Sequence, residues 1–158
     1  MKSSIRHLVL ATIMTFTMGG LGGLCLAQDK ETVIKNREAL MKGQGKDLGS
    51  VKAFIEGKGE LAQAEVGATG LIQSTTKIPE LFPPGSGGTS PDGKYATKPV
   101  IWTDWNKFLE AQKNAHAKAE ALLVAVKSGN KDAVPAAWDD LLKNGCNACH
   151  DTFRERLN

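Results

Sequence analysis

Apolar residues recur at helical spacing, with charged residues between them, along four stretches of the 158-residue chain. The stretches cover approximately residues 30–57, 61–77, 100–127 and 132–150. Nowhere does the chain show the strict alternation of apolar and polar residues that is typical of a strand. The pattern therefore predicts an all-α fold in which four amphipathic helices form a four-helix bundle.

The connections between these stretches differ in length. Gly57-Lys58-Gly59 separates the first two helices, and Ser128-Gly129-Asn130 ends the third. Between the second and third helices lies a long stretch, residues 82–99, that is rich in Pro, Gly and Ser and has no periodicity. We interpret it as a crossover loop, because neither side of it is long enough to form a core alone. Asp132 is the predicted N-cap of the fourth helix, with Pro135 in its first turn.

Three glycines fall inside the first predicted helix, at Gly43, Gly45 and Gly49. Each costs up to about 1 kcal/mol relative to alanine in a helix interior. Two explanations are open: the helix is broken or kinked there, or small residues let its backbone approach a large flat group.

The N-terminus has the three parts of a secretory signal peptide. Lys2 and Arg6 precede an apolar run from Leu8 to Met18, and small residues follow up to Ala27. We predict cleavage after Ala27, which makes residues 1–27 the signal peptide and residues 28–158 a single domain. Two alternatives, a transmembrane anchor and a lipoprotein signal with cleavage at Cys25, are disfavoured.

The anchor is disfavoured because several glycines interrupt the run, which is also short of the about 20 apolar residues that span a bilayer. The lipoprotein signal is disfavoured because the bulky Leu24 stands directly before Cys25. The bacterial type of signal predicts that the protein is exported to the periplasm, with no stable insertion in the membrane after the signal is removed.

The charge balance excludes one class of partner. The chain has 20 basic and 17 acidic residues, and removal of Lys2 and Arg6 with the signal leaves 18 against 17, a net charge of +1. A nucleic-acid-binding protein would need a basic stripe, so this class is excluded. A redox partner protein could still dock on a local patch.

The chemistry of the chain is concentrated in Cys146-Asn147-Ala148-Cys149-His150, eight residues from the C-terminus. C-x-x-C-H is the attachment pattern of haem c, with two thiols for the vinyl groups and an imidazole for the iron. Residues at i, i+3 and i+4 share one helix face, so the two thiols and the imidazole point the same way. We therefore predict one covalently bound haem c, held between the end of the fourth helix and the start of the first.

Two other uses of the cysteines are disfavoured. A thioredoxin-like C-x-x-C does not need the adjacent His150 and would lie near a βαβ unit, which the chain lacks. A structural zinc site would need a second Cys/His pair, and Cys25 departs with the signal. Both remaining cysteines are thus assigned to the haem.

The sixth ligand of the iron must come from upstream, because no methionine follows His150. Once the signal is removed, Met41 is the only methionine and His116 the only other histidine. The sequence leaves three possibilities: Met41, His116 or no sixth ligand. Met41 lies on the apolar side of the first helix, where a core methionine is the alternative. His116 lies at the edge of the apolar side of the third helix, where we expect a solvent-facing side chain.

Taken together, the chain resembles the class II cytochromes c, that is, cytochrome c′ and its low-spin relatives of the cytochrome c-556 type. The resemblance covers essentially the whole chain after the signal. It depends on four matched stretches, which are Asn36–Lys42, Leu81–Gly85, Ile101-Trp102 and Gly145–Arg154. It implies an antiparallel four-helix bundle with one covalent haem c, and frequently a homodimer.

The resemblance also implies roles for single residues. Arg37 matches an arginine beside a haem propionate, for which a solvated surface arginine is the alternative. Met41 matches the distal position, which is a bulky non-ligand in many cytochromes c′ and the iron-binding methionine in the low-spin members. Arg154 matches a basic residue near the proximal face, and Phe153 stands where many members have tyrosine. Lys94-Tyr95-Ala96 in the loop also resembles the low-spin branch.

These expectations lead to two functional hypotheses. The first is a periplasmic one-electron carrier whose low-spin haem is ligated by His150 and Met41, because two protein ligands leave no site for a substrate. The alternative is a high-spin, five-coordinate cytochrome c′ that binds nitric oxide or carbon monoxide at a vacant distal site. An enzyme such as a peroxidase is disfavoured, because Arg37 and Glu38 are interpreted as a propionate partner and a solvated charge.

Overall fold

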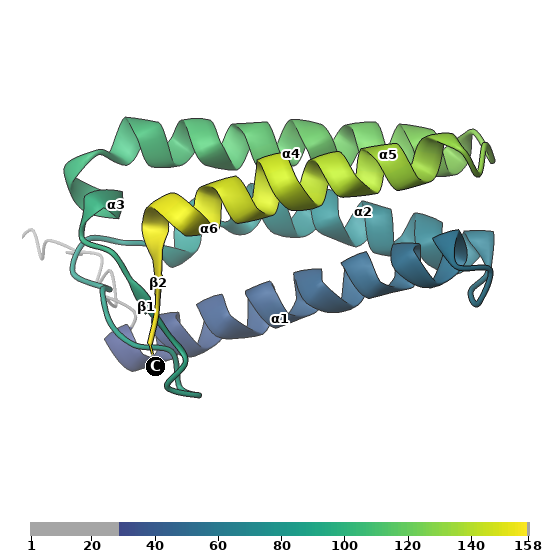
Figure 1. Ribbon diagram of the computed structural model, residues 1–158. Coiled ribbons are helices and arrows are strands. Elements are labelled where there is room, and N and C mark those ends of the chain that lie inside the picture. Colours follow the sequence, from purple (N-terminus) through teal and green to yellow (C-terminus); the bar gives the residue numbers. More distant parts are fainter. Residues whose placement is uncertain (1–28, 158) are drawn as a thin grey trace, which may run out of the picture.

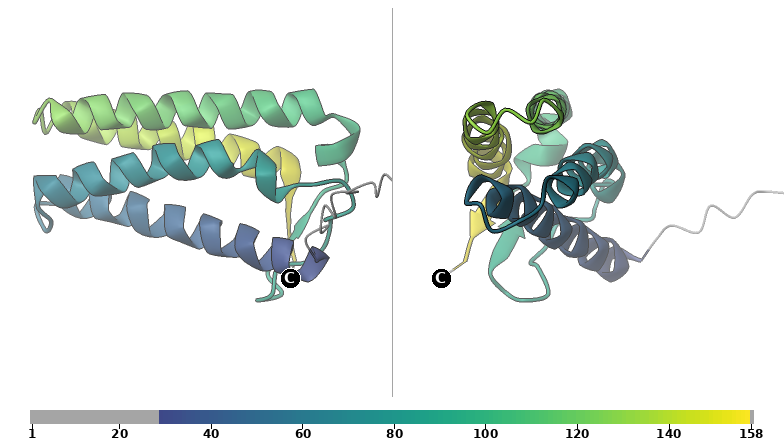
Figure 2. Two further views of the ribbon diagram at one scale, coloured as in Figure 1. Left: turned by 180° about the vertical axis from the view of Figure 1, so that it is seen from behind. Right: turned by 90° about the vertical axis from the view of Figure 1, so that its right-hand side faces the viewer.

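The computed structural model describes residues 29–157, so the predicted signal peptide, residues 1–27, lies outside the described residues. Three long helices, α1 (Lys30–Ile55), α2 (Leu61–Lys77) and α4 (Trp105–Lys127), run antiparallel to their neighbours in sequence (Figure 1). A fourth helical arm combines α5 (Ala133–Asp140), a π-helical segment (Leu141–Asn147) and α6 (Ala148–Phe153). The predicted all-α antiparallel four-helix bundle is confirmed, and the right-hand view of Figure 2 looks along the axis of the bundle.

Helix α1 is continuous through its glycines. Its first turn is capped by Asp29, whose side chain accepts a hydrogen bond from the Thr32 backbone N–H at 3.2 Å. A Cβ added at Gly43, Gly45 or Gly49 would meet nothing within 4 Å. The helix is not broken at these positions, and none of the three glycines lines the cavity described below, so neither explanation from the sequence holds.

The close approach of backbones occurs instead on α2, where Gly67 and Gly70 pack against Asp47 of α1. A Cβ added at Gly67 would lie 2.6 Å from the backbone carbonyl oxygen of Asp47, and one at Gly70 would lie 2.5 Å from its Oδ2 atom. Real Cβ atoms essentially never come so close to another heavy atom. The absence of a side chain at Gly67 thus sets the spacing between α1 and α2.

This spacing predicts opposite effects of one substitution at two helical glycines. Gly67→Ala should lower the free energy of unfolding by about 1–3 kcal/mol, because the backbone of α1 must move. Gly45→Ala should raise it by about 0.5–1 kcal/mol, because alanine is the better helix former and its Cβ meets nothing. Guanidinium denaturation of the haem-loaded protein would measure both changes. Stabilisation by both substitutions would contradict the close approach.

The core consists of two clusters of buried apolar side chains. The larger lies toward the α1–α2 turn and includes Phe54, Leu71, Leu122 and Leu141. The smaller is formed by Ile78, Phe82, Ile101, Phe108 and Phe153. Within it, the ring of Phe108 lies 4.8 Å from that of Phe82 and 5.3 Å from that of Phe153. The smaller cluster thus joins the crossover loop and α4 to the residues that follow the haem motif.

The third and fourth helices differ from their predictions in detail. The third is divided into α3 (Val100–Thr103) and α4 by Asp104, which leaves helical geometry and caps α4 by accepting a hydrogen bond from Lys107 N at 3.3 Å. Asp132 directly precedes α5, as predicted, but its side chain makes no capping bond. The carbonyl oxygen of Asn130 instead accepts from the backbone N–H groups of Ala133 and Val134.

A small antiparallel sheet was not predicted. Strand β1 (Tyr95–Thr97) in the crossover loop pairs with β2 (Arg154–Arg156), with Thr97 opposite Arg154 and Tyr95 opposite Arg156. Strands of three residues are too short to show an alternating pattern in the sequence. The sheet holds the loop, which follows the 3₁₀ turn Pro79–Leu81, beside the start of α1 (Figure 1). Among the described residues, no helix is long and apolar enough to cross a membrane.

Candidate haem site

A cavity of about 290 Å³ lies at the end of the bundle where the crossover loop and the C-terminal strand meet α1. Its walls come from α1, α2, α4, the loop and the last helical arm. Cys146, Cys149 and His150 all line it, as do Met41, Arg37 and Arg154. The structure therefore brings together all six site residues predicted from the sequence.

The attachment residues follow a local change in helix type. Cys146 lies in the π-helical segment and Cys149 and His150 in α6, with both thiols free and half-buried. The preceding Gly145 is buried, and a Cβ added there would lie 3.3 Å from the Cα of Ala115 in α4. Short π-helical segments are frequently found at functional sites. Here the segment lies where the chain passes close to α4 and presents Cys146 to the cavity.

Burial sets the protonation states of the three attachment residues. It raises the pKa of the Cys146 thiol, and it raises the pKa of Cys149 to about 11 with a contribution from Cys146. Burial lowers the pKa of His150 to about 4, and the positive charge of Arg154 is the second cause of this shift. A thioredoxin-like site needs a depressed cysteine pKa, so these thiols do not fit one. The neutral imidazole of His150 is the form that binds iron.

Arg37 supplies an independent test of whether a haem fits this cavity. Its side chain is 7% exposed, and burial lowers the pKa of the guanidinium to about 10, so it stays charged at neutral pH. Among the described residues no carboxylate pairs with it. A buried cation without an anion is costly. A haem would bring propionate carboxylates into the cavity that Arg37 lines, so the charge of the site fits the group.

Arg37 also has a structural task that the sequence did not reveal. Its Nε and Nη2 atoms donate to the carbonyl oxygen of Leu81 at 3.0 and 2.7 Å. Nη2 also donates to the carbonyl and hydroxyl oxygens of Ser86, at 3.1 and 2.8 Å. The guanidinium lies over the Phe82 ring, 4.0 Å from its centroid. It is therefore not a solvated surface arginine, because it fastens the crossover loop to α1.

Arg154 begins β2 and lies on the cavity wall with His150. Its guanidinium lies 4.2 Å from the centre of the Tyr95 ring, across the two-stranded sheet. Its charge is one of the causes that lower the pKa of His150. Arg154 therefore lies close enough to His150 for its charge to act on the imidazole, as predicted.

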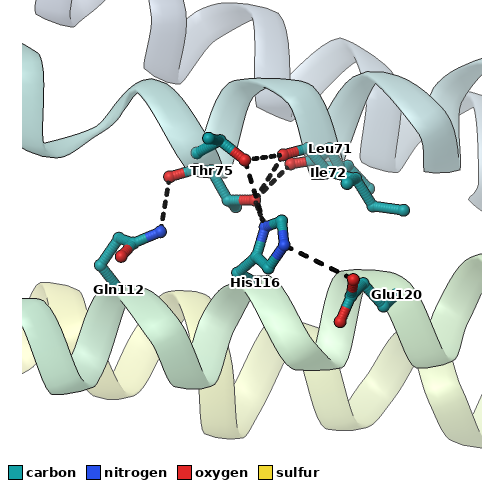
Figure 3. A network of polar contacts seen from close by, with 7 residues as sticks. Leu71, Ile72, Thr75, Gln112, His116 and Glu120 are labelled. Carbon is teal, nitrogen blue, oxygen red and sulfur yellow. Dashed lines mark hydrogen bonds and ion pairs between the residues drawn. The ribbon is translucent and has the colours of Figure 1, made fainter.

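The two candidates for the sixth ligand are placed differently. Met41 is half-buried on the cavity wall and packs against the smaller apolar cluster. His116 is not among the cavity residues, and its side chain is 28% exposed, so it is half-buried where the sequence predicted a solvent-facing residue. Its Nδ1 atom lies 3.0 Å from the Thr75 hydroxyl between α2 and α4, and its Nε2 atom lies 3.6 Å from Glu120 (Figure 3). Met41 therefore remains as the candidate.

Glu38 requires a correction too. It was interpreted as a solvated charge, but its side chain is only 15% exposed and lines the cavity. The Lys42 ammonium lies 2.6 Å from its Oε1 atom and 3.9 Å from Asp92 of the crossover loop. The loop covers this part of α1, which the local sequence could not indicate. Glu38 is held in an ion pair at the rim of the cavity.

Sequence reasoning also missed three polar residues of the cavity, which are Gln44, Thr75 and Gln112. Gln44 and Thr75 are buried within helices whose other inward positions are mostly apolar. One signal was available for Gln44, because it follows Met41 by three residues and so shares its face of α1. For the other two, only the packing of α2 on α4 brings them to the cavity.

A helical bundle whose last arm presents two thiols and a neutral imidazole to one cavity defines a c-type cytochrome with C-terminal attachment of its haem c. A family model described as Cytochrome C' matches residues 32–154. The chain belongs to the cytochrome c′ family, as the resemblance noted in the sequence implied.

Individual relatives agree with this assignment. The chain is 31% identical over 151 residues to a cytochrome c′ of Rhodopseudomonas palustris, covering 93% of this chain and 96% of the relative. It is 27% identical over 156 residues to a cytochrome c-556 of the same organism, covering 96% of this chain and 98% of the relative. A solved cytochrome c′ described as having an unusual ligand-controlled dimer dissociation superimposes with a TM-score of 0.72 at 25% identity, covering 80% of this chain and 96% of the other.

Proposed function

We propose that the chain is a five-coordinate haem protein, with His150 as the single protein ligand, that binds nitric oxide or carbon monoxide on the side of α1. The packing of Met41 carries this proposal, because its contacts with the apolar cluster around Phe108 are those of a core side chain. The match to relatives named cytochrome c′ supports it. The iron of the bound haem would supply the site for the gas and a one-electron couple.

The second candidate is a one-electron carrier with a low-spin haem ligated by His150 and Met41. Two observations favour it: Met41 lines the cavity, and one relative is a cytochrome c-556. Methionine opposite histidine would raise the reduction potential, and two protein ligands would leave no site for a gas. The two candidates therefore differ by one bond from the Met41 sulfur to iron.

Three further proposals accompany both candidates. Residues 1–27 direct export to the periplasm, where residues 28–158 exchange electrons with redox partner proteins. A homodimer is proposed by analogy with the solved relative whose dimer dissociation is controlled by ligand. Gel filtration of the haem-loaded protein with and without carbon monoxide would test the dimer.

Optical spectra of the oxidised and reduced protein distinguish the two candidates, with Met41→Ala as the test variant. For the five-coordinate protein we expect high-spin spectra and carbon monoxide binding in both the wild type and the variant. Leu40→Ala is the matched control, because Leu40 packs on the same cluster but does not line the cavity. A low-spin wild-type spectrum that is lost only in Met41→Ala would contradict the first candidate and establish the carrier.

A further inference from the structure

Gln44 is a buried amide on the face of α1 that bears Met41. Gln44 is 9% exposed, and its side chain lines the cavity one helical turn beyond Met41. Burying an amide is costly unless it is hydrogen-bonded. The hydrogen bonds that Gln44 makes, and the donor that it leaves free, therefore indicate which kind of ligand suits the cavity.

The neighbouring hydroxyl determines which way the Gln44 amide points. Ser74 Oγ donates its single hydrogen to the carbonyl oxygen of Leu71, at 3.1 Å. It can therefore only accept from Gln44, whose Nε2 atom lies 3.1 Å away. One amide hydrogen is committed to Ser74, and within residues 29–157 the second has no acceptor. The NH₂ group is thus fixed in place with one donor to spare.

Two other polar groups of the cavity, those of Thr75 and Gln112, are less suited to donate. The Thr75 hydroxyl lies 2.8 and 2.9 Å from the carbonyl oxygens of Leu71 and Ile72, which take its only hydrogen. Gln112 donates to the carbonyl oxygen of Thr75 at 2.9 Å (Figure 3), and it comes from α4, whereas Met41 is on α1. Of Gln44, Thr75 and Gln112, only Gln44 combines burial, the Met41 face and a free donor.

We propose that Gln44 is a specificity-determining residue, whose amide donates a hydrogen bond to a diatomic ligand bound in the cavity. The inference rests on the proposed gas-binding function and names the polar contact at that site. Hydrogen-bond donors on the distal side of a haem decide which ligands are held and how they react. A donor at Gln44 favours ligands whose outer atom carries partial negative charge.

The test compares haem-loaded Met41→Ala with the double variant Met41→Ala/Gln44→Leu, so that both have an open iron site whether or not Met41 is a ligand. The probe is carbon monoxide on the reduced protein, followed by its infrared stretching frequency and its dissociation rate. Loss of the donor should shift the stretch to higher frequency. It should also speed dissociation about twofold, the lower end of what a neutral hydrogen bond contributes.

The matched control is Met41→Ala/Gln112→Leu, which makes the same chemical change at the other glutamine of the cavity. It should leave the stretching frequency unchanged, and an equal shift in both double variants would overturn the assignment to Gln44. An unshifted frequency in the Gln44 variant would also overturn it, as would failure of Met41→Ala to bind carbon monoxide. Failure of the wild type alone to bind would reject the proposed function but leave the test of Gln44 intact.

Discussion

A chain with both Cys146→Ala and Cys149→Ala should retain no covalently attached haem. The two thiols line one cavity beside His150, and burial raises the pKa of each, so they are held as protonated thiols. Each is expected to form one thioether bond with a haem vinyl group. Cys25 is the only other cysteine and belongs to the predicted signal peptide, so no thiol of the domain can substitute. Mass spectrometry of the denatured protein would measure the loss of the haem mass.

The single variants serve as controls for this expectation. Cys146→Ala and Cys149→Ala should each keep one thioether, so some haem mass should remain in either variant. Cys146 lies in the π-helical segment and Cys149 in α6, so the two attachments depend on different turns of the arm. Covalent haem in the double variant would show that these cysteines are not the attachment residues.

Local pattern was enough to predict what a single helix determines. The period of 3.6 residues gave the four helical stretches, and the spacing of Cys146, Cys149 and His150 placed three reactive groups on one face. The position of Met41 on the apolar side of α1 likewise placed it toward the later helices. These predictions were confirmed because the residues concerned lie within four positions of one another or repeat regularly.

The features that were missed depend on contacts between distant residues. Arg37 donates hydrogen bonds to Leu81 and Ser86, which are 44 and 49 positions away in the sequence, so no local pattern indicates its partners. The burial of Glu38 depends on the crossover loop, which bends over α1 and joins β2. His116 was expected to face solvent, but the packing of α2 against α4 brings the Thr75 hydroxyl to its ring. The sequence of α4 alone cannot indicate this contact. The crossover loop thus forms part of the site.

Replacing Phe108 by alanine should have the largest effect on stability within the described fold. Phe108 is 2% exposed, and its ring contacts those of Phe82, Trp105 and Phe153 at centroid distances of 4.8, 5.1 and 5.3 Å. Truncation of such a buried ring costs about 3–5 kcal/mol, because the space is not refilled. Guanidinium denaturation of the haem-loaded protein would measure this loss.

The same substitution should also change the haem environment, because Phe108 lines the cavity and its ring contacts Phe153, three residues after His150. Phe54→Ala is the matched control: Phe54 is 8% exposed, belongs to the other apolar cluster and is not part of the cavity wall. It should lower stability comparably and leave the optical spectrum unchanged. If Phe108→Ala lowered stability without any spectral change, the aromatic cluster would support the bundle and have no part in shaping the haem site.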